Sequence, residues 1–131
     1  MLEKLSTEVL KAIFNTLPVD LTFVDEADTV RYYSKGDERI FRRAPAVIGR
    51  KVQDCHPQKS LHKVEQVVSD LKSGRRNVAE FWIDLHGRKI YIRYFPVWDV
   101  AGKYRGIVEV SQDITDIKRI EGEKRLLDES S

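Results

Sequence analysis

Apolar residues recur at helical spacing in three parts of the chain. Between residues 2 and 17 they fall every three or four positions, which predicts an amphipathic helix. Pro18 ends this helix, because the residue before a proline avoids the α conformation. A second stripe predicts a helix that starts near Pro57 and Ser60 and stops at Gly74, since glycine is common just past a helix end. A third stripe, at coiled-coil spacing, predicts a helix over residues 113–129.

Alternation of apolar and polar side chains predicts five strands. The first two, residues 19–23 and 29–34, flank an acidic turn and predict a hairpin. The other three follow the middle helix, and they are expected at residues 77–85, 88–98 and 104–112. Residues 36–55 hold glycine and proline among short apolar stretches and predict short helical turns. The order predicts an α+β fold: a five-stranded antiparallel sheet with crossover helices on one face and helices at both termini.

The composition fits one domain without disulfides or a membrane span. The 131 residues are enough for one hydrophobic core, and the longest apolar runs, such as residues 94–98, are far shorter than the roughly 20 residues that cross a bilayer. Residues 1–5 lack the apolar stretch of a signal peptide, and the single cysteine, Cys55, suits a reducing compartment. We therefore expect a cytoplasmic protein with no membrane partner.

The charge balance does not indicate a nucleic-acid partner. The formal net charge is only +2, whereas nucleic-acid-binding domains usually concentrate a larger positive excess. Two basic clusters, at residues 39–43 and 72–76, lie among acidic residues and are expected to be solvated surface.

No catalytic motif stands out in the chain. The sequence has no glycine-rich phosphate loop, no Cys-x-x-Cys, no His-Glu-x-x-His and no Gly-x-Ser-x-Gly. Cys55 and His56 are a poor nucleophile pair, because side chains adjacent in sequence rarely face each other. The sequence therefore predicts a protein that is not an enzyme.

The last predicted strand runs into Asp-Ile-Thr at residues 113–115, and a charged helix is expected after it. In this position the segment 106–115 resembles the end of a PAS domain and its output helix. Further marks shared with PAS domains are Val24-Asp25 at the end of the first strand, Ile48-Gly49 before the short helices, and the turns at Gly87 and Gly102. The resemblance covers about residues 15–116.

A second similarity concerns the subgroup. The segment Cys55-His56-Pro57, together with residues 79–83, is similar to PAS domains of bacteria and archaea that often accompany hemerythrin-like domains. The resemblance implies an N-terminal amphipathic helix (1–17), a PAS core (18–115) and a coiled-coil-like output helix (116–131). It also implies a sensory or interaction module in signal transduction, which holds a small ligand between the sheet and the crossover helices.

Strand alternation sorts the candidate ligand contacts onto one face. Alignment at Asp-Ile-Thr with flavin-binding PAS relatives points one set toward the ligand: Glu80, Trp82, Ile90, Ile92, Tyr94, Ile107, Glu109 and Ser111. The other set would meet the terminal helices or a partner subunit: Phe81, Ile83, Phe95, Val108 and Val110. Cys55 and His56 complete the candidate cavity. In the cavity the carboxylates of Glu80 and Glu109 would need ion-pair or hydrogen-bond partners. Alternatively, each carboxylate pairs with Arg93 or a surface lysine, or a strand bulge turns it outward.

The identity of the ligand stays open at the level of sequence. Flavin photosensors of this family carry a reactive cysteine in an Asn-Cys-Arg-type motif, whereas the cysteine here lies in Asp-Cys-His-Pro. Trp82, Ile90 and Ser111 also replace the expected amide ligands, so flavin is not expected. The alternative to an unidentified small ligand is haem, as in a redox or gas sensor of this fold. His56 is then the first candidate iron ligand and His62 the second. His62 lies on the polar side of its helix, so no iron is expected on it.

The terminal helices predict a homodimer. Apolar stripes are formed by Leu2, Leu5 and Val9 at one end and by Ile117, Ile120 and Leu127 at the other. Isolated amphipathic helices of this length are marginal in water, so the stripes need covering, mainly by contacts of the N-terminal helix with a partner subunit. A signalling partner protein is also compatible with such a module. A further alternative is a purely structural dimerisation domain, in which Trp82, Tyr94 and Ile92 fill the cavity.

Overall fold

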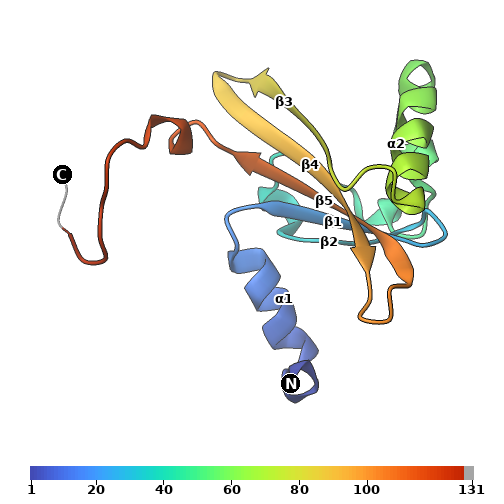
Figure 1. Cartoon of the computed structure of the whole chain (residues 1–131), viewed down its shortest axis with the longest axis horizontal. Coiled ribbons are helices and arrows are strands. Elements are labelled where there is room, and N and C mark those ends of the chain that lie inside the picture. Colours follow the sequence, from blue (N-terminus) through green and yellow to red (C-terminus); the bar gives the residue numbers. More distant parts are fainter. Residues whose placement is uncertain (129–131) are drawn as a thin grey trace.

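The computed structural model describes residues 1–128, apart from the side chain of Asp37, and contains one five-stranded antiparallel sheet with the strand order β2-β1-β5-β4-β3 (Figure 1). The strands are β1 (Asp20–Asp25), β2 (Val30–Tyr33), β3 (Ala79–Leu85), β4 (Arg88–Trp98) and β5 (Tyr104–Asp113). Within these residues the α-helices are α1 (Thr7–Thr16) and α2 (Leu61–Ser73), and neither is long and apolar enough to cross a membrane. The predicted α+β fold is confirmed, and the last strand in sequence, β5, lies at the centre of the sheet.

Helix α2 lies against one face of the sheet. The apolar stripe that predicted this helix buries Val68 and Leu71 against Ile107 of β5. Gly74 ends the helix in a left-handed conformation, and its N–H donates to the carbonyl of Leu71. The crossover segment before α2 has short 3-10 turns at Gly36–Glu38, Pro45–Val47 and Val52–Cys55, as predicted for residues 36–55, and a further one at Gln58–Ser60.

Arg39 ties the crossover segment to the first hairpin. Its side chain is buried, with a residue exposure of 7%, although it belongs to a cluster expected to be solvated. The guanidinium donates hydrogen bonds of 2.7–3.0 Å to four oxygens, which belong to Leu21, Thr22, Ser34 and Phe41. Next to it, the backbone N–H of Ile40 donates to the carboxylate of Asp20 at 2.6 Å. A buried cation is tolerated here because its donors have acceptors.

The Asp-Ile-Thr sequence anchors the end of β5. Arg88 Nε donates to one carboxylate oxygen of Asp113 at 2.7 Å, and the hydroxyl of Thr115 donates to the other at 2.7 Å. The hydrogen bonds from Arg88 and then Thr115 lower the pKa of Asp113 to about 2. The Thr115 hydroxyl oxygen also accepts the backbone N–H of Lys89 at 2.8 Å. The chain is therefore tied to β4 where it leaves the sheet.

The C-terminal helix predicted over residues 116–131 is not formed in the described part of the chain. The structure has a 3-10 turn at Ile117–Arg119 and no further helix up to residue 128. Figure 1 shows this segment extending away from the sheet. An isolated amphipathic helix of this length is marginal in water, and no neighbouring surface covers its apolar side here. The rest of the predicted helix, residues 129–131, lies outside the described residues.

The N-terminal helix begins later than predicted. The hydroxyl of Ser6 accepts the N–H of Val9 at 3.1 Å and caps α1, while Leu2–Lys4 forms a separate 3-10 turn. Helix α1 projects away from the sheet (Figure 1). Its last turn is attached to the core where the Asn15 side chain accepts the N–H of Lys35 at 2.8 Å. Its apolar stripe therefore remains open to solvent.

Gly106 is required where β5 pairs with β1. A Cβ at this position would collide with the carbonyl oxygen of Val24, and the φ of +138° disfavours L side chains. We expect Gly106→Ala to lower the free energy of unfolding by at least about 2 kcal/mol in urea denaturation. Gly102→Ala is the matched control, because Gly102 also has a positive φ but has open space around its Cβ, so about 1 kcal/mol is expected. Equal losses in the two variants would contradict the steric explanation.

Candidate functional site

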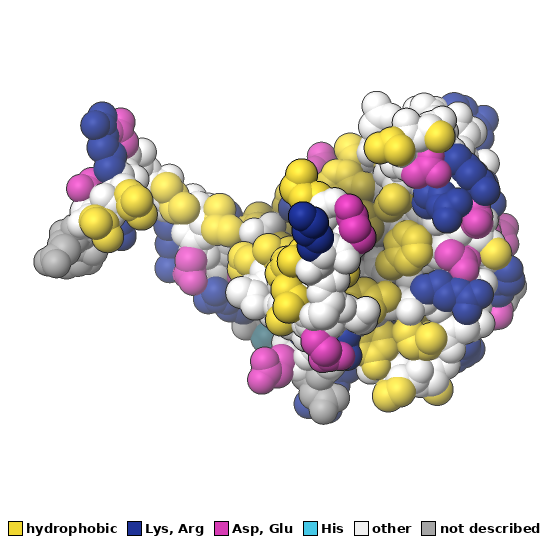
Figure 2. Space-filling model, turned by 90° about the horizontal axis from the view of Figure 1, so that it is seen from below, with side chains coloured by type: hydrophobic (Ala, Val, Ile, Leu, Met, Phe, Trp, Pro, Cys, Tyr) yellow, Lys and Arg dark blue, Asp and Glu magenta, His cyan; other side chains and the backbone are white. Residues whose placement is uncertain are grey.

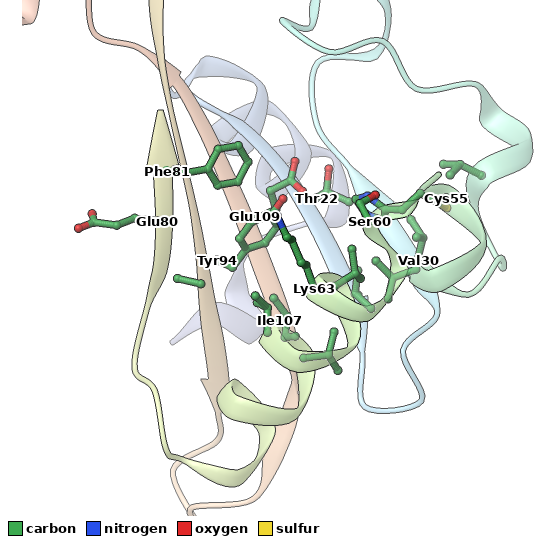
Figure 3. A pocket seen from close by; sticks show the side chains of 18 of the residues that line it. Thr22, Val30, Cys55, Ser60, Lys63, Glu80, Phe81, Tyr94, Ile107 and Glu109 are labelled. Carbon is green, nitrogen blue, oxygen red and sulfur yellow. The ribbon is translucent and has the colours of Figure 1, made fainter. Parts of the chain in front are cut away.

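A cavity of about 440 Å³ lies between α2, the crossover segment and the inner face of the sheet (Figure 3). Its walls are mainly aliphatic, and the aliphatic residues are Val24, Val30, Val47, Val52, Val64, Val67, Val68, Ala79 and Ile107. Two aromatic rings also border it, Phe81 of β3 and Tyr94 of β4, which stack with their centroids 6.2 Å apart. Such walls suit the apolar body of a small molecule.

One wall of the cavity is polar. Arg43 of the crossover segment donates from Nη2 to Oε1 of Glu109 on β5 at 3.1 Å, and the Glu109 side chain is only 14% exposed. The register explains this position, because Glu109 pairs with Thr22 on one side and with Tyr94 on the other, so all three residues share the inner face. His56, at the end of the Val52–Cys55 turn, borders the same cavity. The partner that a buried Glu109 requires is thus Arg43.

Burial sets the protonation of this polar wall. Burial and, after it, the carboxylate of Glu109 raise the pKa of Tyr94 far above its ordinary value, so the phenol keeps its proton. Burial lowers the pKa of His56 although the Glu109 carboxylate acts in the opposite direction, so the imidazole is neutral at pH 7. The wall therefore presents neutral hydrogen-bonding groups beside one ion pair.

Two further cations and one further carboxylate border the cavity. Lys63 extends from α2 into the cavity (Figure 3). Arg76, after α2, pairs with Asp70, with 3.5 Å between Nη2 and Oδ2. The carboxylate of Glu80 points away from the cavity (Figure 3) and accepts a hydrogen bond from the hydroxyl of Tyr91. Positive charge therefore exceeds negative charge on the inward side.

The structure brings several predicted ligand contacts together. Five of them border the cavity, namely Cys55, His56, Tyr94, Ile107 and Glu109, whereas Glu80 borders it with an outward carboxylate. Three share the inner sheet face but are buried in the core beside the cavity rather than lining it: Ile90, Ile92 and Ser111. Ligand contact by any of these side chains stays a prediction.

Trp82 lies on the opposite face from the one predicted. It pairs with Tyr91 across the β3–β4 ladder and is 62% exposed on the outer face. Phe81, expected on the outer face, pairs with Ile92 and borders the cavity, and Ile83 pairs with Ile90 on the same inner face. The inward direction predicted for Glu80 and Trp82 is wrong because it followed the alignment at Asp-Ile-Thr. The strand's own alternation favours the other face, which is apolar throughout, whereas Trp82 lies between two acidic residues.

Sequence reasoning missed Arg43 and the wall formed by α2. The stripe that predicted α2 contains Val64, Val67 and Val68, so its packing on the sheet was the signal that these residues face the cavity. Arg43 lies in an irregular segment, where no periodicity assigns a direction to a side chain. Lys63 carried no signal, because an exposed lysine stem can turn to either side of a helix.

Metal-ligating residues are sparse in this site. Among the side chains that the structure describes, no three from His, Cys, Asp or Glu are grouped so that they could hold a metal ion. His56 borders the cavity, while His62 is exposed on α2 and does not border it. Among the candidate iron ligands, His56 is therefore the one that faces the space where a cofactor would lie.

Comparison with known proteins identifies the family to which this fold belongs. A family model described as PAS domain matches residues 10–115. The C-terminal domain of a Streptococcus mutans protein is 36% identical, with a TM-score of 0.82, over 89% of this chain and 91% of that chain. Two other solved structures show the same fold at low identity. The PAS domain of a Colwellia psychrerythraea protein is 16% identical, with a TM-score of 0.61 over 83% of this chain and 97% of that one. A sensory box sensor histidine kinase from Vibrio cholerae is 11% identical, with a TM-score of 0.56 over 82% and 91%.

Comparison with curated protein sequences gives no match. The resemblance to PAS domains is confirmed, whereas the similarity to the subgroup that accompanies hemerythrin-like domains stays a prediction.

The buried imidazole of His56 predicts a pH-dependent stability. Its pKa in the folded protein lies below the ordinary value of about 6.5, so the unfolded chain binds more protons as the pH falls through that value. The free energy of unfolding should therefore decrease from pH 7.5 to pH 5.5, and His56→Gln should flatten this dependence in urea denaturation. An NMR titration of the His56 ring should give a pKa below 6.5. Equal pH slopes in the two proteins would contradict the assignment.

Proposed function

This chain belongs to the PAS domain family, and we propose that it is a non-catalytic sensory module that binds a small molecule in the cavity beside α2. The observation that carries this proposal is the cavity itself, about 440 Å³ that the described side chains leave unfilled. Aliphatic walls with a few polar groups are typical of small-molecule sites. Trp82, which would help to fill the cavity in a purely structural dimerisation domain, lies on the opposite face. Both observations favour ligand binding over that alternative.

Strand β5 connects the cavity to the C-terminal segment. Ile107 and Glu109 border the cavity, and the same strand ends at Asp113, beyond which the chain leaves the sheet. A ligand that binds one arrangement of β5 more tightly would shift the population of that arrangement, and with it the segment that follows. A signalling partner could read that change, and the same fold in a sensor histidine kinase supports this role.

The proposal includes a cytoplasmic location and no catalytic step. Cys55 is the single cysteine of the chain and is free, which suits a reducing compartment. The family is generally non-catalytic and sensory.

A cavity-filling variant tests ligand binding. Val64 of α2 borders the cavity, so the ring introduced by Val64→Phe should occupy the space of a ligand. We expect native mass spectrometry of the purified protein to show a bound small molecule, and Val64→Phe to reduce its occupancy at least about tenfold. Glu65→Phe introduces the same ring at the next residue, which is exposed and does not border the cavity, and should leave the occupancy unchanged.

An absorption spectrum of the same samples would reveal haem by its Soret band. Equal occupancy in wild type and Val64→Phe would contradict the proposal. So would a wild-type protein that is empty and also binds no member of a small-molecule library by NMR.

We also propose a homodimer held mainly by α1. The exposed apolar residues of the helix and its flanks are Leu5, Val9, Ile13, Phe14 and Leu17, and Figure 2 shows hydrophobic side chains gathered around this helix. The last turn contacts its own domain, where Phe14 lies 5.8 Å from Tyr32 between ring centroids. A ten-residue helix is unstable alone in water, so its stripe needs a covering surface. The half-buried apolar residues on the outer face of β4 and β5 in a second copy would supply one.

Sedimentation at micromolar concentration tests this association. The full chain should sediment as a dimer, at twice the mass of the 15.2 kDa chain, and a protein lacking residues 1–16 should sediment as a monomer. Within the full chain, Ile13→Lys on the apolar stripe should weaken the dimer, whereas Lys11→Ala on the exposed polar side should not. A monomeric full chain would refute the proposal, and a dimeric truncated protein would assign the interface to another surface.

A further inference from the structure

The charges that face the cavity do not cancel. Arg43 and Glu109 neutralise each other through their ion pair, and the carboxylate of Glu80 points away (Figure 3). Arg76 shares the single carboxylate of Asp70 with Arg75. Lys63 extends into the cavity (Figure 3) and makes no ion pair with any side chain that the structure describes. Cations at the border of the cavity therefore outnumber carboxylates.

Arg43 also has a hydrogen-bond donor to spare. Its Nη2 is used by Glu109, whereas its Nε is buried and has no hydrogen-bond partner among the described residues. A buried donor without an acceptor is costly, and most buried donors in folded proteins have a partner. Arg43 borders the cavity, so a rotation of its side chain toward an acceptor oxygen of a ligand would satisfy this group. Glu109 does not oppose it, because its charge is already paired.

We propose that the cavity binds a monocarboxylate with an apolar body, and that its carboxylate lies between the Arg43 guanidinium and the Lys63 ammonium. This inference rests on the proposed function of the cavity and adds the chemical class of the ligand. A negative charge on the ligand offsets the excess of cations at the site. One carboxylate is favoured over two, because the remaining walls are mainly aliphatic and a second charge would have no partner there. Charge-assisted hydrogen bonds from both cations would orient the head group.

The apolar walls set the size of the body. The volume of about 440 Å³ corresponds to roughly fifteen water molecules, so an acid of about ten to fifteen non-hydrogen atoms fits. The valine-rich walls suit a medium-length alkyl chain, and the stacked rings of Phe81 and Tyr94 also accommodate an aromatic body. Fatty and aromatic monocarboxylates share this chemistry.

The test compares three octyl probes that differ only in the head group. Full-length protein is treated with a hydrophobic resin to remove co-purified small molecules and is then titrated at pH 7.5 with octanoate, octanamide and octan-1-ol. Amide NMR signals of the cavity residues report binding. We expect octanoate to bind at least about tenfold more tightly than either neutral probe, because only octanoate carries the compensating charge. A parallel titration with 3-phenylpropanoate, compared with octanoate, distinguishes an aromatic from a fatty acid.

Variants locate the head group. Arg43→Met and Lys63→Met should each weaken octanoate at least about fivefold while changing octan-1-ol little. Lys59→Met removes an exposed lysine that does not border the cavity and should have no effect. Lys63 is exposed, so its variant keeps the test valid if Arg43→Met does not fold.

The outcomes separate this inference from the function it rests on. Neutral probes that bind as tightly as octanoate, or an octanoate affinity unaffected by Lys63→Met, would overturn the carboxylate assignment and leave the ligand cavity intact. Failure of every probe to shift any cavity signal would contradict ligand binding in this cavity altogether.

Discussion

The buried guanidinium of Arg39 determines where the crossover segment lies. It donates to three carbonyls and one hydroxyl, most of them on the first hairpin, so this part of the chain has one position in which the charge is satisfied. Displacing the segment would leave a buried cation with unused donors, which is among the more costly changes in a protein interior. Because Arg43 follows shortly after Arg39, the same constraint brings its side chain to Glu109.

The inner face of the sheet has two chemically different parts. Toward α2 it is aliphatic, and toward the crossover segment it carries a polar stripe in which cross-strand neighbours are paired: Asp20 with Ser111, and Thr22 with Glu109. The crossover segment supplies the matching donors, from Ile40 to Asp20, from Arg39 to Thr22 and from Arg43 to Glu109. The cavity lies where the two parts meet. A molecule held there contacts an apolar surface at one end and ion-paired groups at the other.

Periodicity identified the strands and α2 because each has a distinct buried face. The Asp-Ile-Thr sequence then placed Ile107 and Glu109 on the inner face of β5, and Tyr94 of β4 follows because antiparallel partners share a face. In strand β3 the same alignment pointed Glu80 and Trp82 inward, whereas the alternation of the strand favours the face that carries Phe81, and the register with β4 confirms that this face is the inner one. The prediction of a C-terminal helix failed for a different reason. The spacing of apolar residues shows which face a helix would bury, but not whether any surface is present to cover that face. Arg43 has no periodic neighbours at all, so its direction depends on a tertiary interaction more than sixty residues away in sequence.

The central position of β5 has a consequence for how the chain folds. The strands β1 and β2 form one hairpin and β3 and β4 form another, and β5 is the strand that pairs with both. Two-stranded hairpins are marginally stable by themselves, so neither half of the sheet has lasting order until the final strand arrives. During synthesis the edge of β1 that pairs with β5 therefore stays unpaired until the chain has been made up to Asp113, about eighty residues after the first hairpin. The complete sheet forms only when β5 pairs with segments distant in sequence, and such pairing slows folding. Until β5 is made, the exposed strand edges can aggregate, so the solubility of the nascent chain depends on an intact β5.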